Sequence, residues 1–188
     1  MANADDGRWE LTGTEEGPAL RIFTARFDTF QHPVKGIPLR ATVLATPPWC
    51  NVIALTPENQ MVLVSQFRFG VREVTLEIPG GMVDPGEDHE TAAKRELQEE
   101  TGYTSDDWTY LGACQQNPAF HDELCHMWLA KDVRQALDQT TETRRDSTEH
   151  IHVELMAPVA VVQAVHDGTF QHPHAIVALS RVYDLRIT

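Results

Sequence analysis

The stretch "GGMVDPGEDHETAAKRELQEETGY", residues 80–103, joins a glycine-rich loop to an acidic segment with helical spacing. Asp88 can cap a helix and acidic side chains are favoured in a first turn, so we expect the helix to begin near Asp88 or His89. Ala93 and Leu97 are four residues apart and form an apolar stripe on this helix. The stripe indicates that the helix packs against the core of the domain.

Three glutamates gather beside that apolar stripe. Glu96 and Glu100 are four residues apart and share one helical face, and Glu99 lies one step behind them. Like charges at this spacing repel each other, so the face is either fully solvated, as most glutamate runs are, or neutralised by a cation. Clustered carboxylates are the hard oxygen ligands that Mg²⁺ and Mn²⁺ prefer.

Short apolar runs separated by proline, glycine and polar residues surround this helix. Such runs predict β-strands, here at 20–30, 39–46, 50–56, 61–69, 73–79, 108–115, 124–130 and 151–156. Residues 57–59 predict a hairpin turn, and two proline-opened segments, 158–168 and 172–185, predict helices. Strands around a central helix, followed by terminal helices, indicate a layered α/β domain with a mixed sheet.

Two polar segments lie outside this pattern. Residues 1–18 are either a frayed tail or a short edge strand. Residues 138–150 form a long polar loop, which is either an active-site lid or an insert without a role. Because the chain has 188 residues and 41% hydrophobic content, we expect residues 19–188 to form a single domain.

Composition narrows the class of partner. A formal charge of -13 opposes binding to nucleic-acid phosphates. Neither a signal sequence nor a membrane-spanning run is evident, so we expect a cytoplasmic protein without a membrane partner. Cys50, Cys114 and Cys125 lie in apolar surroundings without metal-type spacing, which favours buried free thiols.

The spacing of the acidic segment resembles the Nudix box, the signature of hydrolases that act on a nucleoside diphosphate linked to another group. The box positions are all matched, with Tyr103 as the one departure from the usual aliphatic residue. They are Gly81, Glu87, Arg95, Glu96, Glu99, Glu100 and Gly102. The resemblance implies a Nudix-type α/β/α sandwich with a mixed central sheet.

The same resemblance implies roles for the residues of the box. Glu96, Glu99 and Glu100, with the carbonyl of Gly80, would hold Mg²⁺, for which Mn²⁺ can substitute. Arg95 would act with Glu99 in the catalytic centre and, through an ion pair to Glu87, would orient the cluster. Gly81 and Gly102 would be structural.

Flanking residues are similar to the branch of the family that cleaves ADP-ribose and nucleoside diphosphate sugars. The similarity rests on "LVSQFRFGV" (63–71), "LEIPGGMVDPGE" (76–87) and Pro118. It implies hydrolysis to a nucleoside monophosphate and a sugar phosphate, and a homodimer with residues 19–60 at its interface. The alternatives are a pyrophosphohydrolase of nucleoside triphosphates or other capped diphosphates, and a Nudix binding module without turnover.

The candidate substrate-binding residues are two arginines, one glutamate and one aromatic residue. Arg68 and Arg72 are candidates to bind the pyrophosphate, or else surface ion-pair partners. Glu77 either supports the metal loop or ends a strand with its carboxylate in solvent. A base would need an aromatic face, for which Phe120 is a candidate. Other rings that are either core residues or platforms are Phe27, Phe30 and Trp49.

The general base is expected outside the helix, because in this branch a glutamate on a mobile loop often takes that role. Loop 138–150 offers Glu149 as our first choice and Glu142 as the second, with Asp146 nearby. The histidines form no zinc-binding pattern and are interpreted as surface or capping residues, with His121 the one considered for substrate contact.

Overall fold

The computed structural model of the chain describes residues 7–136 and 150–186. Two compact units divide the chain: residues 1–47 with 115–123, and residues 48–114 with 124–188. The elements are β1 (Glu10–Ala19), β2 (Thr24–Gln31), β3 (Pro38–Ala45), β4 (Trp49–Leu55), β5 (Met61–Arg68), β6 (Glu73–Glu77), β7 (Gly80–Met82), α1 (His89–Thr101), β8 (Tyr103–Thr104), β9 (Asp107–Gln115), β10 (Leu124–Lys131), β11 (Arg134–Gln135), β12 (Ile151–Met156), α2 (Pro158–His166) and α3 (Pro173–Ser180).

The first unit contains an antiparallel sheet in the order β1-β2-β3. Strand β1 takes in residues 10–18, so the edge-strand alternative holds for this part of the polar N-terminal segment. Nearly every side chain of β1 is exposed, which is why its sequence lacks the apolar alternation of a half-buried strand.

The second unit is built on a seven-stranded sheet in the order β12-β5-β4-β10-β9, with β6 beside β5 and β7 beside β4. Strand β10 runs parallel to β4, whereas β5 and β7 run antiparallel to it. The predicted mixed sheet is therefore confirmed. The predicted hairpin turn is present too, closed by a hydrogen bond from the Thr56 amide to the Gln60 carbonyl.

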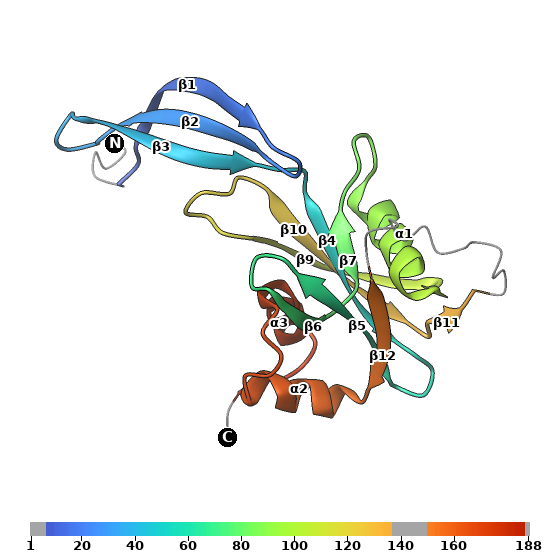
Figure 1. The fold of residues 1–188 in the computed structure, drawn as a ribbon. Helices are drawn as coiled ribbons and strands as arrows, with labels where there is room; N and C mark the ends of the chain where they lie inside the picture. Colours follow the sequence, from blue (N-terminus) through green and yellow to red (C-terminus); the bar gives the residue numbers. More distant parts are fainter. Residues whose placement is uncertain (1–6, 137–149, 187–188) are drawn as a thin grey trace. The chain divides into compact units, whose positions relative to one another are not determined.

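In the second unit the sheet lies between α1 on one face and α2 and α3 on the other (Figure 1). Each face of the sheet carries an apolar cluster. On one face Val52 of β4 packs in a cluster with Leu97 of α1. On the other face the next residue, Ile53, packs with Val161 of α2 and Leu179 of α3. Successive side chains of a strand point to opposite faces, so this alternation produces the predicted α/β/α sandwich.

Helix α1 begins and ends at residues suited to its termini. The Asp88 carboxylate accepts hydrogen bonds from the amides of Glu90 and Thr91, both at 2.9 Å. At the other end Gly102 adopts a φ of 76°, and its amide donates to the Gln98 carbonyl. Among the described residues, no helix has the length and hydrophobicity of a membrane-spanning segment.

Candidate active site

The backbone of Gly80 is turned away from its neighbouring strand. On one side of it the Val52 amide donates to the Pro79 carbonyl, and on the other the Val83 amide donates to the Pro48 carbonyl, both at 2.8 Å. In an antiparallel pair the bonded positions alternate with positions whose N–H and C=O point outward. Gly80 occupies such an outward position, so its amide and carbonyl face away from β4.

Two contacts hold Gly80 and Gly81, the first residues of β7, against α1. The Gly80 amide donates to Glu100 Oε2 at 2.9 Å, and Glu100 is only 7% exposed. At Gly81, an added Cβ would lie 2.5–2.8 Å from the Glu96 carboxyl group. The Glu96 carboxylate thus rests against the Gly81 backbone, where an added side chain would displace it.

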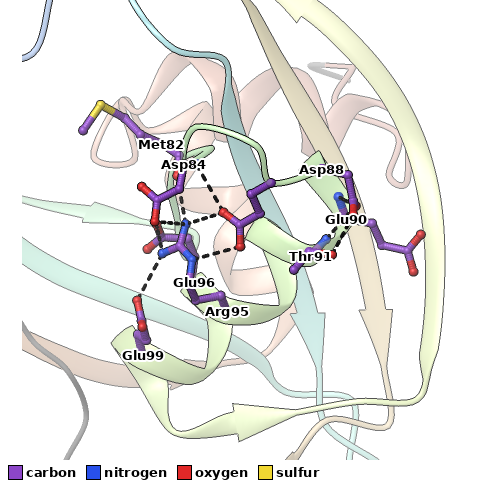
Figure 2. A network of polar contacts seen from close by, with 9 residues as sticks. Met82, Asp84, Asp88, Glu90, Thr91, Arg95, Glu96 and Glu99 are labelled. Carbon is purple, nitrogen blue, oxygen red and sulfur yellow. Dashed lines mark hydrogen bonds and ion pairs between the residues drawn. The ribbon is translucent and has the colours of Figure 1, made fainter.

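Arg95 gathers the remaining carboxylates (Figure 2). Its Nε and Nη2 donate to the two oxygens of Glu87 at 3.1 and 3.0 Å, and Nη2 also donates to the Met82 carbonyl. Its Nη1 donates to Glu96 at 2.7 Å and to Glu99 at 3.1 Å. The expected Arg95–Glu87 ion pair is therefore present. The hydrogen bonds from Arg95 lower the pKa of Glu87, and those bonds in turn raise the pKa of Arg95.

The oxygen donors here suit a hard divalent cation. Glu96 and Glu100 both contact the Gly80–Gly81 backbone, and Glu99 shares Arg95 with Glu96. Within the described residues, no group of three or more His, Cys, Asp or Glu side chains is placed so that it could hold a metal ion by itself. Mg²⁺ does not require such a group, because it commonly takes one or two carboxylates and completes its shell with water and substrate phosphate. The residues present therefore fit such an ion.

A second charged group lies at the end of β5. Arg68 donates from Nε and Nη2 to the two oxygens of Glu77, at 2.7 and 2.6 Å. The Thr75 hydroxyl donates to the same carboxylate at 2.6 Å. Glu77 is only 3% exposed, which excludes the alternative of a solvated strand end. Burial opposes its ionisation, but the bonds from Arg68 and Thr75 hold the pKa of Glu77 below its ordinary value.

His172 lies beside the Arg68–Glu77 pair. The sequence around His172 did not indicate this position. Its Nε2 lies 3.7 Å from Glu77 Oε2. It is the N-cap residue of α3, yet its side chain makes no capping hydrogen bond and is largely buried. The interpretation of this histidine as a surface or capping residue is therefore wrong, because its side chain is largely buried and lies next to Glu77. Burial lowers the pKa of His172 to about 4 despite the nearby carboxylate, so the ring is neutral at pH 7.

The other predicted site residues are placed as follows. Arg72 is exposed in the turn after β5, where its φ is 61°. Phe120 belongs to the first unit and is 40% exposed. Glu142, Asp146 and Glu149 lie outside the described residues.

Two curated relatives carry names that bear on chemistry. The chain is 38% identical over 105 residues to the ADP-ribose pyrophosphatase of Bacillus subtilis, covering 56% of this chain and 54% of that protein. It is 35% identical over 120 residues to the methanol dehydrogenase activator of Bacillus methanolicus, covering 64% of each. The matches thus span between half and two thirds of these relatives.

The fold and the family are supported by two broader matches. A solved structure described as an ADP compounds hydrolase aligns with a TM-score of 0.77 at 20% identity, covering 93% of this chain and 92% of that one. At that identity the likeness concerns the fold alone. The sequence model of the NUDIX domain matches residues 47–178, well over half of the chain. The chain therefore belongs to the Nudix family.

Proposed function

We propose that this protein hydrolyses the pyrophosphate bond of ADP-ribose or another nucleoside diphosphate sugar, releasing a nucleoside monophosphate and a sugar phosphate. The observation that carries the proposal is the attachment of the acidic face of α1 to the glycine loop, through Gly80–Glu100 and through Glu96 over Gly81. Similarity to an ADP-ribose pyrophosphatase supports this substrate class.

Glu96, Glu99, Glu100 and the outward-facing Gly80 carbonyl are the proposed ligands of Mg²⁺, with Mn²⁺ able to substitute. Divalent cations bound there would neutralise pyrophosphate charge and lower the pKa of the attacking water. Arg95 directs Glu96 and Glu99 to one side of the helix and is itself held by Glu87. We assign Arg95 and Glu87 the role of keeping these ligands in place.

Arg68 is the proposed pyrophosphate ligand of the protein. Its guanidinium is fixed by two bonds to Glu77, while 40% of its side chain stays exposed to an incoming oxygen. A guanidinium held in one orientation loses less entropy when it binds a phosphate. Glu77 thereby acts as a positioning residue. Arg72 and Phe120 stay predictions as further substrate contacts.

Glu149 is the proposed general base, with Glu142 as the second choice. Either carboxylate would accept the proton of the attacking water as the phosphorus–oxygen bond forms. Glu149 precedes β12, which pairs with β5, the strand that carries Arg68.

We also propose a homodimer formed through residues 19–60. The support is a set of exposed apolar side chains in the first unit, of the kind that mark interaction surfaces where they form a patch: Leu20, Ile22, Val34, Ile37 and Leu39. Light scattering of the purified protein measures the oligomeric state.

A cytoplasmic location is proposed because all three cysteines, each within the described residues, are free thiols.

The test is a substrate panel of ADP-ribose, ADP-glucose, GDP-mannose, UDP-glucose and deoxynucleoside triphosphates, each with Mg²⁺ or Mn²⁺. Products are identified by chromatography. We expect a nucleoside monophosphate and a sugar phosphate from at least one diphosphate sugar. Release of inorganic pyrophosphate from a triphosphate alone would favour the triphosphate alternative, and no cleavage at all would favour the binding module.

A further inference from the structure

Asn51 is packed directly on the glycine whose carbonyl is a proposed metal ligand. The two residues are opposite each other in the β4–β7 pair. A Cβ added to Gly80 would overlap both the Cys50 carbonyl oxygen and Asn51 Nδ2. Asn51 is 7% exposed, and its carboxamide packs against one side of the Gly80 backbone.

The carboxamide is itself held from the next strand. Cys125 of β10 donates from Sγ to Asn51 Oδ1 at 3.1 Å. Cys125 is fully buried, and burial raises the pKa of its thiol, so the donor hydrogen is retained across the physiological range. A thiol donor selects the carbonyl oxygen of the amide. This choice directs Nδ2, rather than Oδ1, towards Gly80.

We infer that Asn51 is a positioning residue for the proposed metal site and that Cys125 fixes its orientation. Gly80 is held by the Asn51 carboxamide on the side of β4 and by Glu100, which accepts its amide hydrogen, on the side of α1. A glycine backbone is otherwise the most freely rotating in the chain, and rotation would turn its carbonyl away from the ligand position. The inference rests on the proposed function, because it takes that carbonyl as a ligand.

The test measures Mn²⁺ affinity of the full chain by electron paramagnetic resonance, without substrate. Asn51→Leu keeps the approximate size but removes both amide contacts, and we expect the Mn²⁺ dissociation constant to rise about tenfold, as for other outer partners of metal ligands. Cys125→Ala is expected to weaken binding in the same direction, whereas Cys125→Ser keeps a donor and is expected to bind as the wild type does. Ile53→Val is the matched control, since Ile53 is two residues further along β4 on the same face as Asn51, but packs with α2 and α3 rather than with Gly80.

The outcomes separate the inference from the proposed function. Wild-type Mn²⁺ affinity in both Asn51→Leu and Cys125→Ala would overturn the inference and leave the proposed metal site standing. Absence of saturable Mn²⁺ binding in the wild type would overturn both. If Asn51→Leu does not fold, as judged by circular dichroism, the Cys125 pair decides: weaker binding in the alanine variant than in the serine variant supports the inference, and equal binding overturns it.

Discussion

The amide of Gly80 donates a hydrogen bond to the carboxylate of Glu100, 20 residues later in the chain. The bond joins the first residue of β7 to the last turn of α1. It places an outward-facing carbonyl and a row of carboxylates on the same side of the second unit. The remaining contacts of the site maintain this arrangement, and each gives a prediction.

Arg95→Lys is expected to lower the free energy of unfolding by about 1–3 kcal/mol, because an ammonium cannot reproduce the paired bonds to Glu87 together with those to Glu96 and Glu99. Urea unfolding at pH 7 measures the change. Lys94→Ala is the control on the same helix, since its exposed pair with Glu90 contributes at most about 0.5 kcal/mol. Equal losses in the two variants would contradict the role given to Arg95.

Gly81→Ala is expected to displace the Glu96 carboxylate, because the added methyl would lie 2.5–2.8 Å from it. We expect a loss of ADP-ribose hydrolysis of about ten- to a hundredfold, as for other disturbed metal ligands. Steady-state kinetics provide the measurement. In Gly70→Ala the new Cβ meets open space and activity should be retained. A fully active Gly81→Ala enzyme would show that Glu96 need not lie against the loop.

Stability is expected to fall as pH is lowered from about 6.5 towards 4, through His172. Its pKa is about 4 in the folded protein, below the ordinary value of 6.5, so the unfolded chain takes up a proton first. The stabilisation is present above pH 6.5 and lost as pH falls through 4, with a total of up to about 3 kcal/mol. Urea unfolding at pH 7 and pH 4.5 should give a smaller difference for His172→Gln than for the wild type. The exposed His152→Gln should match the wild type, and an unchanged pH dependence in His172→Gln would refute the assignment.

Arg68→Lys is expected to raise the KM for ADP-ribose about tenfold, because a point charge cannot keep two bonds to Glu77 and bind a phosphate oxygen as well. Arg186→Lys, an exposed change outside the site, controls for the lost guanidinium. A KM equal to that of the wild type would remove Arg68 from the substrate site.

Sequence reasoning located the helix start at Asp88, the positions of the longer strands and the residues of the acidic cluster, because capping chemistry and apolar periodicity are local properties. It missed β7, whose three residues include two glycines and carry no side-chain pattern. It also missed the environments of His172 and Asn51. Their partners, Glu77 and Cys125, are 95 and 74 residues away, and only the folded chain brings these pairs together.

The most direct test of the account compares Glu100→Gln with Glu90→Gln in Mg²⁺-dependent hydrolysis of ADP-ribose. Both changes remove one charge from α1, but Glu100 is buried against Gly80 whereas Glu90 is exposed in the first turn. The account predicts that Glu100→Gln lowers the rate about a hundredfold while the Glu90→Gln rate stays near that of the wild type, with both variants folded by circular dichroism. Equal rates in the two variants would contradict the claim that the acidic face at Gly80 performs the chemistry.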